Sequence, residues 1–395
     1  MSDIEKDKTS LIPLANQGLT ARSASLVRRG LDSIKRNDGR IVHFPENYSI
    51  GKYLLKNADE CFYEWEIDSA KEARGDTFIP LDMKLGFWIE SDISLSTLAN
   101  LNLDSLIFLD CRGISDNSLV YLEGLTSLNE LHVYGKKISN NGLFILKGLT
   151  SLKGLSLYGN NISADGLIHL QELPSLKCLE LSSNNISNIG LAHLGKMTLL
   201  DILGLFNNNI TDDGLIYLQG LSSLALLNLS NNNTSGEGLI HLQGLNSLKW
   251  LFLDCNNIND EDLIHLKELK AIKSLDLSLN NITDEGLAHL RGLTSLESLS
   301  LRWNYISGGG LAHLQGLTSL KELDLSDSNI TDEDLIHLKE LTSLEVLTLG
   351  DNNISDEGLI YLQGLTSLEW LYLHNNDISD EGLTLLRKWL PGCSI

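Results

Sequence analysis

The chain has 395 residues, a length that would ordinarily suggest two or three domains. Its formal net charge is −22, from 30 basic and 52 acidic residues. This balance argues against binding to nucleic acid or to an anionic membrane surface.

The N-terminal sequence MSDIEKDKTS is charged and lacks the apolar segment of a signal peptide. No stretch is apolar enough over its length to span a membrane. The five cysteines are odd in number, widely spaced and without a CxxC pair, which argues against a disulfide framework or structural zinc. We therefore expect a reducing compartment, either the cytoplasm or, for a delivered effector, the cytosol of a host cell.

Residues 1–95 do not repeat and form the first predicted domain. The apolar spacing of Ser23–Arg36 predicts a short amphipathic helix, and the alternation in Cys61–Ile67 predicts a strand. Phe87–Ile89 is expected to open a degenerate first repeat. Solenoids need terminal caps because an end repeat exposes apolar surface. Two interpretations stay open for residues 1–95: a cap with a small α+β module, or a separate effector or adaptor domain.

From about residue 96 the sequence repeats every 24 residues without insertion or deletion. The unit at 344–368 shows the pattern LxxLxLxxNxI, closed by Ile354 and followed by SDEGL and further leucines. Such a period indicates stacked units that share one continuous core. The LxL segment predicts a short strand with its leucines inward, and the following half predicts a short helix.

This pattern closely resembles the leucine-rich repeat family over residues 96–395, and in particular bacterial repeats of the ribonuclease-inhibitor-like and GALA type. The resemblance implies an α/β solenoid, or horseshoe, of about 12 repeats that binds proteins. Strands stack about 4.8 Å apart, whereas helices need about 10 Å. We therefore expect a parallel sheet on the concave face and helices on the convex face.

Each predicted helix starts at a Ser, Thr or Asn, residues whose side chains accept hydrogen bonds from the first free N–H groups. Acidic residues such as Asp356 and Glu357 follow, where the helix dipole favours negative charge. Glycines such as Gly220 and Gly364 are expected to close the helices in the left-handed conformation. Residues 383–395 resemble a C-terminal cap, with Trp389 over the last core layer.

Two further ladders run through the repeats. An Asn ladder that includes Asn184 and Asn352 is expected to turn inward and bind the backbone, with Lys136 and Ser328 as departures. A histidine ladder, for example His265 and His289, lacks accompanying ligands, so no metal site is predicted. No nucleophile elbow, phosphate loop or catalytic dyad is present. We expect neither a cofactor nor enzymatic activity.

Five positions per repeat point out from the predicted sheet or flank it: eight, six, four, three and one residues before the closing Ile. Aromatic residues gather there, and exposed apolar surface usually marks a partner site. Acidic residues such as Asp254 and Asp276 surround them, so a basic rim is expected on the partner. The predicted partner-binding residues are Tyr134, Tyr158, Ile202, Phe206, Leu226, Trp250, Phe252, Arg302, Trp303, Tyr305, Trp370, Tyr372 and His374.

The sequence thus predicts a monomeric scaffold that binds a protein or peptide on its concave face. The alternative is a targeting arm whose activity lies in residues 1–95, as in a bacterial effector or a ubiquitin-ligase-type substrate receptor. An enzyme with its site on the solenoid has no residue support.

Overall fold

The computed structural model describes residues 35–36, 39–57, 70–80, 83–101 and 106–395. They form two compact units, an N-terminal unit that extends to Val133 and a repeat unit from Tyr134 to Ile395. The strand β8 (Glu130–Tyr134) contains the boundary. A domain boundary at residue 95, inferred from the repeat pattern, stays a prediction.

The N-terminal unit combines antiparallel and parallel strands. The strand β2 (Gly39–His43) pairs antiparallel with β1 (Lys35–Arg36) and β5 (Asp76–Pro80). A second set places β3 (Lys52–Asn57) antiparallel to both β4 (Lys71–Glu72) and β6 (Met83–Ile89). The helix α4 (Asp92–Ala99) then leads to β7 (Leu106–Arg112), which runs parallel to β6, and a 3₁₀ helix η3 (Asp116–Leu122) follows.

The parallel pair β6–β7 with its intervening helix confirms that Phe87–Ile89 opens a repeat-like unit. The β6 residue Phe87 also packs with Phe44 and Tyr53 in an aromatic cluster, with ring centroids 5.6–6.1 Å apart. The predicted helix Ser23–Arg36 lies outside the described residues except for Lys35–Arg36. Those two residues pair with β2 as a strand, so the prediction is wrong there. The predicted strand Cys61–Ile67 also lies outside the described residues.

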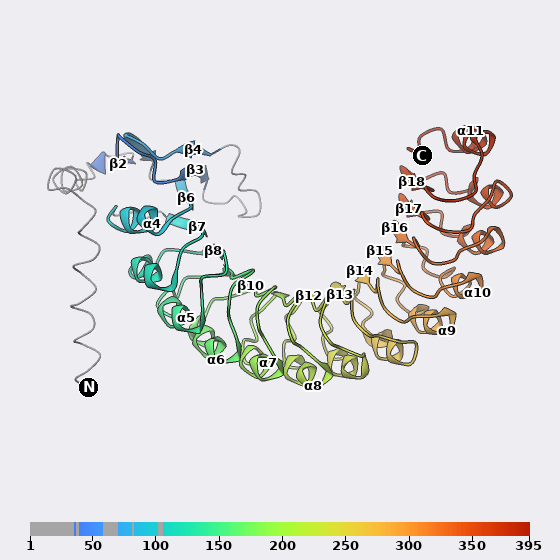
Figure 1. Ribbon diagram of the computed structural model, residues 1–395, viewed down its shortest axis with the longest axis horizontal. Helices are drawn as coiled ribbons and strands as arrows, with labels where there is room; N and C mark the ends of the chain where they lie inside the picture. Colours follow the sequence, from blue (N-terminus) through green and yellow to red (C-terminus); the bar gives the residue numbers. More distant parts are fainter. Residues whose placement is uncertain (1–34, 37–38, 58–69, 81–82, 102–105) are drawn as a thin grey trace. The chain divides into compact units, whose positions relative to one another are not determined.

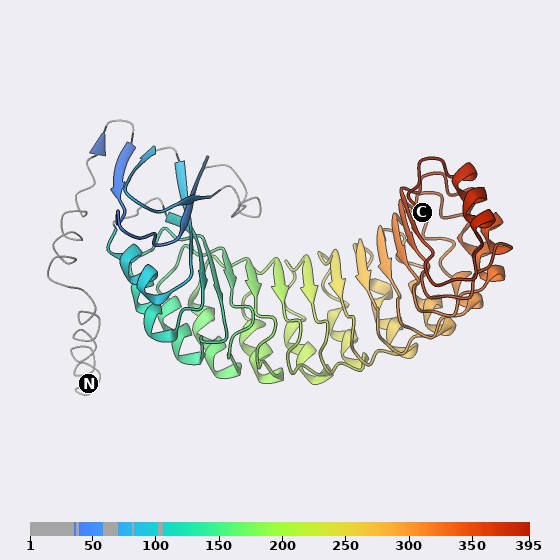
Figure 2. The ribbon, with the colours of Figure 1, turned by 45° about the horizontal axis from the view of Figure 1, so that its top comes forward.

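The repeat unit is a stack of coils, each with a three-residue strand and a short helix. Figures 1 and 2 show its strands lining the inner side of the unit's arc and its helices the outer side, as expected. Neighbouring strands are parallel and in register at the 24-residue period. The strands are β9 (Gly154–Ser156), β10 (Cys178–Glu180), β11 (Ile202–Gly204), β12 (Leu226–Asn228), β13 (Trp250–Phe252), β14 (Ser274–Asp276), β15 (Ser298–Ser300), β16 (Glu322–Asp324), β17 (Val346–Thr348) and β18 (Trp370–Tyr372).

The convex side alternates between α and 3₁₀ geometry because each helix is too short to settle into regular α-helical bonding. The α-helices are α5 (Asn140–Leu146), α6 (Ala164–Leu167), α7 (Asn188–Leu194), α8 (Asp212–Leu215), α9 (Asp284–Leu287), α10 (Gly308–Leu311) and α11 (Asp380–Trp389). The 3₁₀ helices are η4 (Ile168–Glu172), η5 (Ile216–Leu218), η6 (Glu237–Leu242), η7 (Glu261–Glu268), η8 (Ala288–Leu290), η9 (Asp332–Leu338) and η10 (Gly358–Leu362).

The Asn ladder joins successive coils, as predicted. The buried Asn184 amide nitrogen donates to the carbonyl oxygens of Leu157 and Leu181 at 3.0 and 2.9 Å, while its oxygen accepts the Ile162 N–H at 3.0 Å. Each ladder amide therefore satisfies backbone groups of its own coil and of the preceding one. At Ser328 the side chain is too short to span coils, and its hydroxyl instead donates to the Ser326 carbonyl.

Hydrogen bonds between neighbouring coils join the helix starts, and the pattern of a single repeat did not predict them. The residue at or just before the helix start of one coil, often Asp, accepts hydrogen bonds from the Ser or Thr that precedes the helix of the next coil. Asp332 accepts from the N–H and the hydroxyl of Ser355 at 2.7 and 2.6 Å, and Asp260 does the same for Thr283. Some predicted caps also form, as at Ser379. These acids therefore hold neighbouring coils together, in addition to any dipole effect.

The helix-closing glycines do not adopt the predicted left-handed conformation, because Gly220 and Gly364 are absent from the residues with positive φ. Each helix instead ends in a tight turn, such as the Leu365 N–H to Leu362 carbonyl bond, which keeps φ negative. At the C-terminal end, Trp389 is half-buried and Leu390 is buried. The tail then pairs with β18 through the Ser394 N–H and carbonyl.

Candidate binding surface

The outward residues of the repeat unit lie on the face of the sheet opposite the leucine core. Along β13 the side chain of Leu251 is fully buried, whereas Trp250 is 39% exposed and Phe252 is half-buried. The alternation follows from the two-residue period of a strand. Every coil therefore contributes its own outward side chains to one continuous concave face.

A concave strip, defined as Ile202, Leu226 and Trp250, crosses three consecutive strands. The strand register places each residue directly beside the next, from β11 to β12 and from β12 to β13. Phe252 lies on the same face of β13 and is opposite Asp276 of β14. Phe206 is half-buried in the loop after β11. The structure thus confirms the predicted juxtaposition of the strip, while its binding role stays a prediction.

A second group, the rim cluster, lies in the loops after β14 and β15 and consists of Leu279, Trp303 and Tyr305. All three side chains are exposed, and Leu279 and Trp303 both have φ of +56°. Asn, Ser or Asp fills this left-handed position in most coils, and bulky residues adopt it only at an energetic cost. Leu279 was not among the predicted partner-binding residues, because the prediction started from the positions of the aromatic residues.

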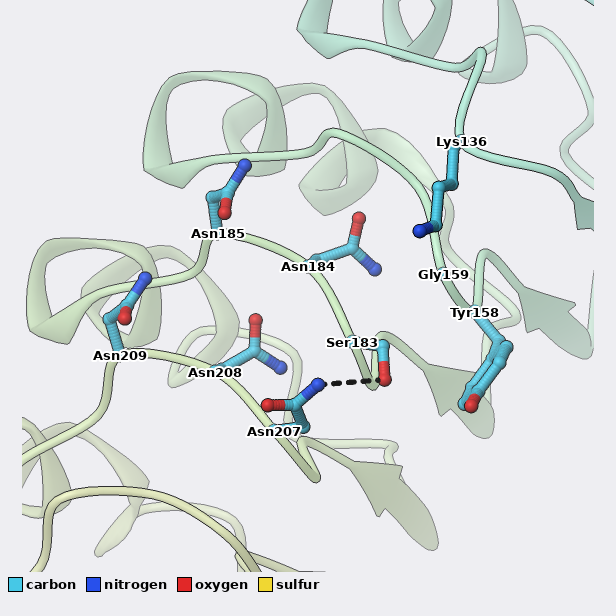
Figure 3. A pocket seen from close by; sticks show the side chains of 9 residues that line it. All are labelled: Lys136, Tyr158, Gly159, Ser183, Asn184, Asn185, Asn207, Asn208 and Asn209. Atoms are coloured by element: carbon cyan, nitrogen blue, oxygen red, sulfur yellow. Dashed lines mark hydrogen bonds between the residues drawn. The ribbon is translucent and has the colours of Figure 1, made fainter.

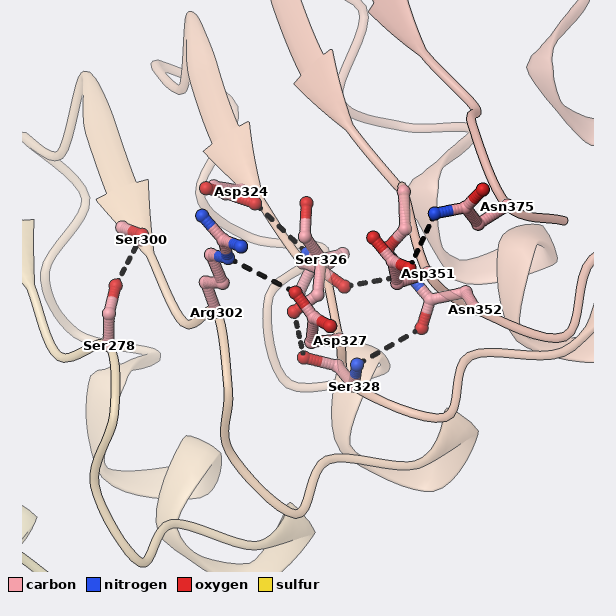
Figure 4. Close-up of polar contacts among 12 residues, drawn as sticks. Ser278, Ser300, Arg302, Asp324, Ser326, Asp327, Ser328, Asp351, Asn352 and Asn375 are labelled. Atoms are coloured by element: carbon pink, nitrogen blue, oxygen red, sulfur yellow. Dashed lines mark hydrogen bonds and ion pairs between the residues drawn. The ribbon is translucent and has the colours of Figure 1, made fainter.

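Arg302, predicted to bind a partner together with Trp303, forms an ion pair within the protein. Its Nε lies 3.1 Å from a carboxylate oxygen of Asp327, and the Asp327 side chain is only 16% exposed. Figure 4 shows this pair among polar side chains of the strands and following loops from β14 to β18. Arg302 is therefore already paired within the protein, although its side chain is 51% exposed.

Aromatic pairs lie in the first and last coils of the repeat unit. Tyr134 and Tyr158 meet edge to face, with ring centroids 6.5 Å apart. Trp370 and Tyr372 stack on β18 at 6.4 Å with their planes 8° apart. His374 lies 3.3 Å from the Asp351 carboxylate, and its ring fills the space beside Gly350. The predicted residues thus form four separate groups along the concave face and its rim.

Acidic groups accompany the concave strip. Asp254 continues β13 beyond Phe252, and Asp276 lies on the neighbouring strand. Burial raises the pKa of Asp276; hydrogen bonds from Ser278 lower it, and the like charges of Asp254 and Asp324 raise it. A cation brought to this face would therefore relieve repulsion that already exists within the protein.

The histidine ladder lies on the convex side and joins neighbouring coils. Gln171 bonds the His193 ring at 2.9 Å, and Gln315 bonds the His337 ring at 3.0 Å, each across one coil. Among the described residues, no group of three or more His, Cys, Asp or Glu side chains is arranged to hold a metal ion. None of the described helices combines the length and apolarity needed to cross a membrane.

Comparisons with known proteins agree with this architecture. The leucine-rich repeat family models match residues 172–195, 196–218, 246–306 and 318–378. An internalin from Listeria monocytogenes is similar at 28% identity and a TM-score of 0.60, over 77% of this chain and 84% of that one. A TDR receptor shares the fold at 21% identity and a TM-score of 0.51, over 74% of this chain and 55% of that one. No curated protein sequence matches significantly. With its in-register strands, Asn ladder and 24-residue period, the chain belongs to the leucine-rich repeat proteins.

Proposed function

We propose that this chain is a non-enzymatic scaffold that binds a protein or peptide on the concave face of its repeat unit. The concave strip is the observation that carries the proposal. Three apolar side chains, those of Ile202, Leu226 and Trp250, are aligned by the strand register on the face opposite the core, and Phe252 adds aromatic surface beside them. Aligned apolar groups on a rigid sheet provide the contact area and the pre-ordered geometry from which interface hot spots are built.

The chemistry of the surface favours a partner with a basic rim. Phe252 is flanked by Asp254 and Asp276, and no lysine or arginine of the described residues forms an ion pair with either carboxylate. Residues 96–395 carry a net charge of −19, from 17 basic and 36 acidic residues. We propose that the protein alone is monomeric and that nucleic acid and membranes are not its partners, because both would be repelled.

The test is affinity capture with mass spectrometry from the cells in which the protein acts. The Trp250→Ala/Phe252→Ala double variant should lose the captured partner while its circular dichroism spectrum stays unchanged. Ile240→Ala is the matched control, because Ile240 is an exposed apolar residue on the convex helix η6. Equal capture by the double variant and the wild type would show that the partner binds elsewhere.

A second candidate function places an effector or adaptor activity in residues 1–95, with the repeats selecting its target. The aromatic cluster of Phe44, Tyr53 and Phe87 favours it, since a mere cap does not need a cluster of three packed rings. A chain of residues 96–395 that still captures the partner but loses the cellular effect would support this function. Aggregation of that chain would instead indicate a cap, because loss of β6 uncovers the apolar strand β7.

We also propose that the protein acts in a reducing compartment such as the cytoplasm. Four of its five cysteines lie in the described residues, and all four are free thiols. Burial raises the pKa of the Cys111 thiol well above its usual range, which keeps it protonated and unreactive. Localisation of the tagged full-length chain by microscopy tests this proposal directly.

A further inference from the structure

A polar pocket of about 520 Å³ lies in the first coils of the repeat unit, and none of the residues of the concave strip lines it. It opens among the loops that follow β8 to β11, and Figure 3 shows the side chains that line it. Its volume is within the range of small-molecule sites, about 300–1,000 Å³. Unlike most such sites it is walled by amides, a hydroxyl, an ammonium and one aromatic ring.

The pocket is hollow because of one residue. The left-handed loop position of successive coils holds Gly159, Ser183, Asn207 and Asn231, with φ between +51° and +67°. The latter three fill the position with side chains, whereas a Cβ on Gly159 would meet nothing within 4 Å. The absence of a side chain at Gly159 therefore leaves a space at the end of a row that is otherwise occupied.

The positive charge at the pocket belongs to Lys136, which replaces the Asn of the ladder in its coil. Lys136 stands where later coils have Asn160 and Asn184, whose amides are buried. With φ of +62°, Lys136 exposes its side chain instead, and Figure 3 shows the ammonium directed toward the pocket. No described carboxylate pairs with Lys136, and none lines the pocket. The site is thus locally basic within repeats that are strongly acidic overall.

The hydrogen bonds around the pocket leave donors available. The Asn231 amide donates to the Asn207 oxygen at 2.9 Å, and the Asn207 amide donates to the Ser183 hydroxyl at 3.2 Å. This series of hydrogen bonds ends at Ser183, whose own O–H has no acceptor among the described residues. The Tyr158 hydroxyl and the Asn209 amide likewise have no partner there. These groups can donate to, and mostly also accept from, a polar ligand.

We propose that this pocket binds an acidic saccharide. The Lys136 ammonium and the Ser183 hydroxyl would hold the carboxylate through charge-assisted hydrogen bonds. Side-chain amides such as that of Asn209 both donate and accept, as the hydroxyl groups of a sugar do. The Tyr158 ring, 44% exposed, offers an aromatic face to the weakly positive C–H groups of a pyranose. This inference is independent of the partner proposed for the concave strip.

The experiment is saturation-transfer difference NMR on the full chain at an ionic strength of about 0.15 M, where long-range repulsion by the acidic protein is screened. The probes are digalacturonic acid, a neutral galactose disaccharide and inorganic phosphate. Gly159→Asn fills the space with a residue that already adopts this backbone conformation at Asn207 and Asn231. Lys136→Gln removes the charge, and Lys339→Gln at the end of η9 is the matched control.

We expect digalacturonic acid to bind, with Gly159→Asn abolishing the signal and Lys136→Gln raising Kd about tenfold, as loss of a charged hydrogen bond requires. Lys339→Gln should bind like the wild type, and all variants should keep the wild-type melting temperature. Absence of binding at millimolar concentration, or binding that survives Gly159→Asn, overturns the proposal. Equal binding of the neutral disaccharide, or of phosphate alone, shows that the site does not select an acidic sugar.

Discussion

The strands β7 and β13 occupy equivalent places in the repeat pattern, yet their outward residues differ in exposure. On β7 the outward residue Phe108 is 4% exposed, whereas on β13 Phe252 at the same position is half-buried and Trp250 is 39% exposed. Within the N-terminal unit, Leu54 and Ala70 pack against the cluster of Trp88, Ile107 and Phe108. An outward apolar residue therefore marks a binding surface only where the chain does not cover that face itself.

The largest effect expected from this comparison concerns the two aromatic rings. Phe108→Ala should lower the free energy of unfolding of its unit by about 3–5 kcal/mol, because a buried ring is replaced by a cavity. Trp250→Ala should cost no more than about 1.5 kcal/mol, because much of that ring already contacts water. Denaturant unfolding with hydrogen exchange of β7 and β13 measures both. Similar losses of unfolding free energy in the two variants would mean that Phe108 and Trp250 are equally buried.

Burial also makes the N-terminal unit sensitive to acid. Desolvation beside Phe108 lowers the pKa of His132 from 6.5 to about 4. The unfolded chain thus binds more protons than the folded one between these values, so stability is intact near pH 7 and falls as pH drops from about 6.5 to 4. The loss should reach about 3 kcal/mol.

His132→Gln isolates this effect, because it removes the titrating group but leaves other ionisable residues unchanged. Relative to the wild type, the variant should gain stability as the pH falls from 7 to 4 in urea unfolding series. Parallel pH profiles for the two proteins would exclude His132 as the cause. His374→Gln serves as the exposed control, because the His374 side chain is 58% exposed.

Within the repeat unit, the adjacent residues Asn256 and Asn257 allow the stability effect of a buried ladder asparagine to be compared with that of an exposed one. The buried Asn256 accepts from the Thr234 N–H and hydroxyl and donates to three carbonyls, including that of Leu229. Asn256→Ala should lower the free energy of unfolding by about 2 kcal/mol, because buried backbone groups lose their partners. Asn257→Ala, at an exposed site, should change it by less than about 0.5 kcal/mol. Thermal melts that coincide for the two variants would contradict the ladder's role.

The smallest predicted effect concerns the acidic residues at the helix starts. Asp332→Ala removes the acceptor for Ser355 of the next coil and should cost about 1 kcal/mol. Glu333→Ala removes the same charge at the neighbouring residue. Because Glu333 makes no such contact, this variant should leave the free energy of unfolding nearly unchanged. Because both variants change the net charge equally, any difference in melting temperature reports the hydrogen bonds alone. Equal shifts would assign the effect to charge.

Prediction from sequence succeeded where the period alone decides the geometry. A 24-residue repeat without insertions forces Ile202, Leu226 and Trp250 into register, and it aligns the Asn ladder in the same way. Prediction failed where a contact joins one coil to the next or where backbone conformation matters. The bond from Ser355 to Asp332 crosses 23 residues, and the φ of Leu279 follows from its position in a loop; neither feature has a local signal.

The amino-acid sequence by itself determined the solenoid, its parallel sheet and which side chains face outward, because strand alternation and an invariant period leave one way to bury the leucines. Only the tertiary structure decided which outward positions stay open. Phe108 and Trp250 both point away from the leucine core, but burial depends on segments distant in sequence that pack over one and not over the other. The space beside Gly159 is likewise a property of neighbouring coils, since no single repeat contains its walls.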